Sequence, residues 1–152
     1  MEGADLVTVG ASAPAAADEA AVFHAYVEFW QADMAALARS DPAWPPLLER
    51  VSGQQRTGTV ALLTANRDKG QHVTGTITIR PQVLVVRGAA ATVRDCADLS
   101  GSQAVDSAGR PVDGTKGKAG VEYSVTLVQS GPRWTVDNID TVESANGTAC
   151  TG

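Results

Sequence analysis

Residues 73–100 limit how this chain can fold more than any other stretch, because polar and apolar residues alternate there. From Val73 to Arg80 the alternation has a period of two and the residues are mostly β-branched, which predicts a strand with one apolar face. Pro81 interrupts the pattern and indicates a bulge or an edge strand, because proline has no backbone donor. Gly88 predicts a tight turn before a returning strand at 89–98. The stretch therefore predicts two long strands joined by a turn.

Three helices are predicted before these strands. The first covers residues 15–38, where apolar side chains recur three or four residues apart and alanine fills many other positions. A short second helix is predicted at 44–51, where two prolines are tolerated in the first turn. The third runs from about 54 to 69, and Gly70 can adopt the left-handed conformation that ends a helix.

Two further strands are predicted toward the C-terminus. Residues 101–120 are rich in glycine and show no sustained period, which predicts a long exposed connection. Residues 121–129 and 133–142 again alternate, and Trp134 and Val136 are expected to face inward. A glycine and a proline between these segments predict a hairpin turn.

Helices followed by an antiparallel meander predict an α+β fold, with N-terminal helices packed on a curved antiparallel sheet of about four strands. Such a fold encloses a cone whose interior lies between the first helix and the sheet. The 152 residues match the size of one domain, which we expect to cover residues 15–150. Residues 1–14 are rich in Ala, Gly, Ser and Pro, which predicts a flexible N-terminal tether.

The charge pattern argues against a nucleic-acid partner. The net charge is −5, with 17 acidic and 12 basic residues, and the arginines are scattered along the chain. No apolar run approaches the roughly 20 residues of a membrane-spanning helix. Because the opening resembles a tether, we expect a signal or lipid anchor to precede it in the natural protein, and we expect an extracellular or cell-envelope location.

Two cysteines, Cys96 and Cys150, lie far apart in the sequence. They belong to no Cys-x-x-Cys pair, and His24 and His72 are the only histidines, so a zinc site is not expected. Two unpaired thiols and one disulfide both remain open. We favour the disulfide, because the tether-like start suggests an oxidising compartment. No cofactor and no metal ion are predicted.

Several short motifs support a family resemblance. They are Tyr26–Trp30 (YVEFW) on the first helix, Val93–Ser100 (VRDCADLS) at the end of a strand, Gly131–Val136 (GPRWTV) at the start of the last strand, and the terminal Cys150. Over roughly residues 15–150 the chain resembles the nuclear transport factor 2-like superfamily, and in particular its small exported or lipid-anchored actinobacterial members. The β-hairpin usually found between the second and third helices of that superfamily is missing from the predicted elements.

The resemblance implies a cone-shaped fold and a cell-envelope location, but it implies no reaction. The fold hosts isomerases, dehydratases, cyclases and proteins without catalytic activity. Its ketosteroid isomerases use a carboxylate base and hydrogen-bond donors in an apolar cavity. The residues that we expect to line a comparable pocket here are Tyr26, Trp30, Asp33, Tyr123, Trp134 and Asn138.

A structural interpretation of these polar residues is favoured over a catalytic one. Tyr26 and Tyr123 are typical of core aromatic residues with their hydroxyl groups at the rim. Asp95 and Asp98 are typical of carboxylates near a strand end that accept hydrogen bonds from nearby backbone amides. No catalytic residue is therefore assigned.

Two hypotheses from different classes follow. The first is a non-enzymatic cell-envelope or secreted domain that binds a protein partner or a small apolar ligand; a second copy paired through the sheet is a further candidate partner. The alternative is a small isomerase or dehydratase that acts in the cone cavity.

Overall fold

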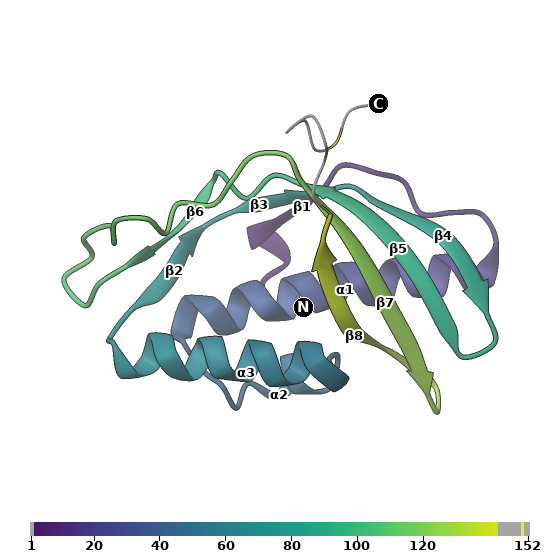
Figure 1. Cartoon of the computed structure of the whole chain (residues 1–152), viewed down its shortest axis with the longest axis horizontal. Coiled ribbons are helices and arrows are strands. Elements are labelled where there is room, and N and C mark those ends of the chain that lie inside the picture. The colour runs from purple at the N-terminus through teal and green to yellow at the C-terminus, as the bar shows by residue number, and fades with distance from the viewer. Residues whose placement is uncertain (1, 143–149, 151–152) are drawn as a thin grey trace.

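The computed structural model describes residues 2–142 and residue 150, and in it a curved sheet arches over one long helix (Figure 1). In chain order the elements are a 3₁₀ turn η1 (Ala4–Leu6), β1 (Val7–Val9), α1 (Ala17–Arg39), α2 (Pro45–Leu48), α3 (Gly53–Asp68), β2 (His72–Gly75), β3 (Ile77–Ile79), β4 (Pro81–Arg87), β5 (Ala90–Ala97), β6 (Ser102–Val105), β7 (Val121–Ser130) and β8 (Arg133–Thr141).

The main sheet is antiparallel and has the strand order β4-β5-β7-β8. α1 lies beneath it and buries a stripe that includes Val22, Phe29 and Leu37. This stripe packs with inward residues of the strands, such as Val93 and Leu127, in one hydrophobic core. The structure thus confirms the α+β fold, with N-terminal helices packed on a curved antiparallel sheet of about four strands. It also confirms that β4, which begins with Pro81, is an edge strand.

The first of the two long strands predicted in residues 73–100 is broken into β2, β3 and β4. Gly75 ends β2 with a φ of 98°, and a Cβ atom there would lie 1.9 Å from the carbonyl oxygen of Gly101. Only glycine fits so close an approach. After this break the pieces take different partners: β2 pairs with β6, β3 with β1, and β4 with β5. The prediction of one continuous strand was wrong for this reason.

Two segments expected to lack regular structure contain strands. Within the predicted tether, β1 pairs in parallel with β3, and Val7 is buried in the core. The tether prediction is therefore wrong for residues 4–9. Within the predicted connection at 101–120, β6 pairs with β2, and Ala104 and Val105 are buried. Both pairings join segments far apart in the sequence, which local periodicity does not reveal.

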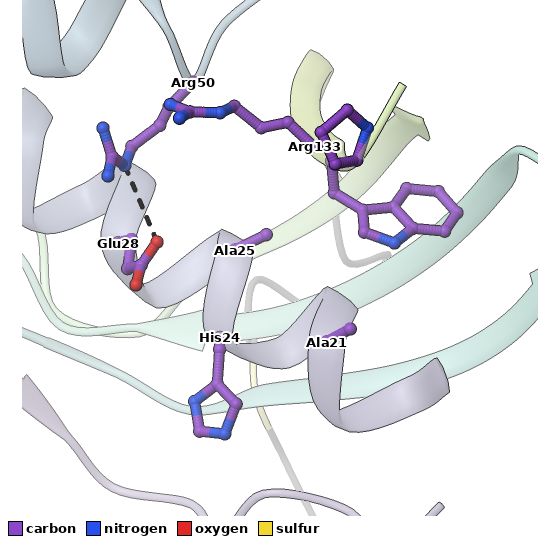
Figure 2. Close-up of a pocket in the computed structure, with 8 residues that line it drawn as sticks. Ala21, His24, Ala25, Glu28, Arg50 and Arg133 are labelled. Carbon is purple, nitrogen blue, oxygen red and sulfur yellow. Dashed lines mark ion pairs between the residues drawn. The ribbon is translucent and has the colours of Figure 1, made fainter. Parts of the chain in front are cut away.

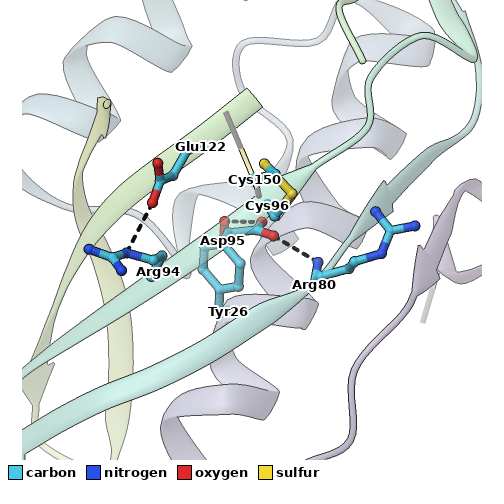
Figure 3. The surroundings of a disulfide bond; sticks show 7 residues. All are labelled: Tyr26, Arg80, Arg94, Asp95, Cys96, Glu122 and Cys150. Atoms are coloured by element: carbon cyan, nitrogen blue, oxygen red, sulfur yellow. Dashed lines mark hydrogen bonds and ion pairs between the residues drawn. A yellow bond between two sulfur atoms is a disulfide. The ribbon is translucent and has the colours of Figure 1, made fainter. Parts of the chain in front are cut away.

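The disulfide favoured from the sequence is present between Cys96 and Cys150. Cys96 follows the inward-facing Asp95 on β5, so its side chain points to the opposite face of the sheet (Figure 3). Beside it on that face, Arg94 forms an ion pair with Glu122 of β7 at 3.1 Å. The bond thus fastens Cys150 to the outer face of the central strand β5. Among the described residues, none of the helices is long and apolar enough to cross a membrane.

Replacing both cysteines by serine is expected to lower the free energy of unfolding by up to about 4 kcal/mol, because the bond restricts the unfolded chain. The two cysteines are separated by 54 positions, which sets that magnitude. Urea denaturation checks the loss, and wild-type protein unfolded with a reductant is the matched control. Intact mass after denaturing reduction should rise by about 2 Da; no mass change would contradict the disulfide.

Candidate functional site

A buried hydrogen bond joins α1 to the middle of the sheet. The Tyr26 hydroxyl donates to Oδ2 of Asp95 at 2.6 Å, although the two residues are 69 positions apart. The other carboxylate oxygen of Asp95 accepts a hydrogen bond from the Arg80 backbone N–H at 2.7 Å (Figure 3). The side chains of Tyr26 and Asp95 are both fully buried. Asp95 does accept a hydrogen bond from a backbone amide, but the donor lies 15 residues away, and neither the burial of Asp95 nor its side-chain partner on α1 was predicted.

The surroundings of Tyr26 and Asp95 shift the pKa values of both side chains. Burial raises the pKa of Asp95, while the hydrogen bonds from Tyr26 and from the Arg80 backbone partly oppose that rise. Burial also raises the pKa of the Tyr26 hydroxyl, and the neighbouring Asp95 adds to the rise. A carboxylate and a donor therefore meet in an apolar interior. They meet within the filled core, where Phe29 and Leu63 are also buried, and Asp95 lines none of the cavities described below.

A second carboxylate, Asp33, lies in the buried stripe of α1. Burial raises its pKa to about 7. Tyr123 stands opposite Asp95 on β7, and its ring stacks on Trp30 with 6.1 Å between the ring centroids. The pKa of Tyr123 is raised by burial first and then by the charges of Asp95 and Asp33. The interior between α1 and the sheet therefore contains acidic groups that favour their protonated forms.

Asn138 does not face the interior, contrary to the prediction. The pairing of β7 with β8 shifts by one residue, so that Val136 pairs with Leu127 while Asn138 pairs with Thr126. Asp137 is the extra residue of this bulge, and it reverses the alternation after Val136. Asn138 consequently lies beside exposed Thr126, and its amide donates to Asp140. Ile139, the next residue of β8, takes the inward position and packs against the core.

A cavity of about 410 Å³ lies between α1, α3, β2 and β6, and we call it the mouth cavity. Its lining is mainly apolar, with uncharged polar groups and one lysine. The lining residues are Trp30, Met34, Leu37, Leu62, Asn66, Lys69, Gln71, Val73, Ile77, Leu99, Ser102, Gln103, Ala104, Thr115 and Gly117. Its volume lies in the lower part of the range of small-molecule sites.

Among the residues expected to line a pocket, Trp30 alone lines the mouth cavity. Tyr26 and Asp33 are core residues, Tyr123 is half-buried against Trp30, and Trp134 lines a different hollow. The sequence analysis missed the lining from β6, because residues 101–120 show no strand period.

Two hollows at the surface carry charged residues. One of about 250 Å³ is lined by Glu28, Arg50, Arg133 and Trp134 among others (Figure 2). Its arginines are already paired: Arg50 with Glu28 at 3.7 Å, and Arg133 with Glu49 at 3.1 Å. His24 is exposed at the other side of this hollow and points away from the arginines. The second hollow contains Arg39, Arg67 and His72.

Within the described part of the chain, no group of three or more His, Cys, Asp or Glu residues is arranged to hold a metal ion.

The searches with family models and of curated proteins gave no match. The comparison with solved structures did give matches, and two of them are described here. The intermembrane space region of the chloroplast protein ARC6 matches with a TM-score of 0.53 and 12% identity, over 86% of this chain and 100% of that one.

A protein from Xanthomonas campestris, described as a calcium/calmodulin dependent protein kinase II association domain, matches with a TM-score of 0.46 and 13% identity. That match covers 86% of this chain and 90% of the other. The likeness to the ARC6 region shows a shared fold alone.

Replacing Tyr26 by Phe is expected to lower the free energy of unfolding by about 2 kcal/mol at neutral pH, because Asp95 loses a hydrogen bond inside the core. The loss should shrink in acid, where a protonated Asp95 needs the donor less. Denaturant unfolding at both pH values measures this difference. Tyr123→Phe is the matched control, since Tyr123 is half-buried and stacks through its ring. Equal losses for the two variants would contradict the assignment.

Asp33 predicts a dependence of stability on pH. Its pKa is raised from 3.8 to about 7 in the folded protein, so the folded state binds this proton more tightly than the unfolded state. The associated stability is complete below about pH 4 and is lost as the pH rises toward 7.

Asp33→Asn should therefore be more stable than the wild type near pH 8, by up to about 4 kcal/mol at about 1.4 kcal/mol per pKa unit. Near pH 4 the two proteins should differ little. Thermal unfolding across this range measures the difference. Asp113→Asn removes the same charge from an exposed loop and serves as the control. A constant difference at all pH values would contradict the burial argument.

Proposed function

We propose that this chain is a non-enzymatic binding domain that holds a small apolar ligand in the mouth cavity. The proposal rests on the mouth cavity, which has a volume of about 410 Å³ and is lined mainly by apolar side chains. Its few amide and hydroxyl groups can orient a ligand. Leu62, one of three large exposed apolar side chains in the described residues, lies on its lining.

The positions of the carboxylates favour binding over catalysis. An isomerase or dehydratase of this fold would need a carboxylate base that reaches a bound substrate. Asp95 is held by Tyr26 and by the Arg80 backbone inside the filled core, and Asp33 is buried in the stripe of α1. The mouth cavity offers apolar contact instead. The binding hypothesis therefore accounts both for the mouth cavity and for the position of the carboxylates in the filled core.

The proposal includes a family and a location. The helix motif at Tyr26–Trp30, the turn at Gly131–Val136 and the overall architecture support membership of the nuclear transport factor 2-like superfamily, in its small exported or lipid-anchored actinobacterial type. The Cys96–Cys150 disulfide supports an extracellular or cell-envelope location, because disulfides persist in oxidising compartments.

Binding of 1-decanol, followed by isothermal titration calorimetry, tests the proposed function. Leu62→Asp should weaken binding about tenfold, because a charge replaces apolar contact worth roughly 1.4 kcal/mol. The control is Leu84→Asp: Leu84 is 46% exposed on β4 and Leu62 is 53% exposed on α3, but Leu84 lies outside the cavity. If decanol fails to bind, or if both variants weaken it equally, the mouth cavity is not the site.

A further inference from the structure

Beside the mouth cavity is a second hollow of about 390 Å³, which we call the basic hollow. Its lining residues are Ala38, Arg39, Ser40, Arg67, Gly70, Gln71, His72 and Ser107. Two guanidinium groups, an imidazole and two hydroxyl groups thus border one space, and none of these lining residues is a carboxylate. The hollow thus groups two cationic side chains, each of which also pairs with one carboxylate outside the lining.

The basic hollow adjoins the mouth cavity. Gln71 lines both spaces. Near the end of α1, Leu37 lines the mouth cavity and Arg39 lines the basic hollow. At the start of β2, Val73 lines the mouth cavity and His72 lines the basic hollow. The same segments therefore present an apolar surface on one side of Gln71 and a basic surface on the other.

The arginines have ordinary structural roles that explain only part of this arrangement. Arg39 and Arg67 lie in the last turns of α1 and α3, where positive charge complements the helix dipole. Arg39 also pairs with Glu2 and lies over the ring of Trp44, with 4.1 Å to its centroid. Arg67 is paired only loosely with Asp68, at 3.6 Å, and its side chain is 58% exposed. Its donors are therefore available to a ligand.

We propose that the ligand is a single-chain amphiphile with an acidic head group, a carboxylate or a phosphate ester. Its apolar chain lies in the mouth cavity and its head group binds in the basic hollow. Arg67 and Arg39 supply guanidinium donors, which form strong, often bidentate hydrogen bonds with such oxyanions, and His72 adds a ring nitrogen. This inference rests on the proposed function and adds the chemical class of the ligand.

Calorimetry with decanoate, decyl phosphate, 1-decanol and inorganic phosphate tests the inference. Decanoate and decyl phosphate should bind about tenfold more tightly than decanol. Arg67→Gln should remove most of that gain and leave decanol binding unchanged. Arg94→Gln is the matched control: it removes one arginine that is similarly exposed, at 57%, but lies on the outer face of β5. It should leave the binding of all the probes unchanged.

The outcomes separate the two proposals. If decanol binds and the two acidic probes bind no more tightly, the head-group inference is wrong and the proposed function stands. If inorganic phosphate binds as tightly as decyl phosphate, the basic hollow is an independent anion site and the amphiphile is excluded. If none of the alkyl probes binds, both proposals fail. An equal loss in the Arg67 and Arg94 variants would show a general charge effect and would overturn the assignment to the basic hollow.

Discussion

The hydrogen bond between Tyr26 and Asp95 is the interaction on which the arrangement of α1 and the sheet depends. A buried carboxylate costs several kcal/mol unless it is hydrogen-bonded or neutralised. Asp95 meets this cost with a donor from α1 and a backbone donor between β3 and β4. Because Tyr26 is fully buried, a rotation of α1 would remove the donor and also expose the apolar stripe. The Tyr26–Asp95 hydrogen bond thereby selects one orientation of α1. Apolar packing alone would specify that orientation less sharply.

The two faces of β5 are fixed by consecutive residues. Asp95 points inward to α1, while Cys96 points outward to Cys150 (Figure 3). The hydrogen bond restrains the folded state, whereas the disulfide acts mainly on the unfolded chain. The central strand is therefore held from both sides by different physical means. The mouth cavity lies farther along α1, where its lining includes Trp30, Met34 and Leu37.

Local periodicity was enough to predict the three helices, the strands β5, β7 and β8, and the fold class. It failed where a residue's environment depends on distant segments. The bulge at Asp137 reverses the side of Asn138, and β1 is a strand only because β3 lies beside it. The inward position of Asp95 could have been found, since it alternates with Val93 on the apolar face of β5. The mouth cavity could not, because its lining joins α1, α3, β2 and β6 only in the folded chain.

The residues that line the hollows are only partly those that form the core, and this has a consequence for specificity. Tyr26 and Phe29 lie in the core and Leu37 both packs in the core and lines the mouth cavity, whereas the exposed residues Leu62 and Arg67 only border a hollow. Exposed lining residues such as Leu62 and Arg67 contribute little to the packed core, so their replacement costs little stability. The lining can therefore change its ligand preference while Asp95 and its partners keep the fold intact. A fold built in this way can serve many ligands, because the exposed part of the lining can change without altering the residues that form the core.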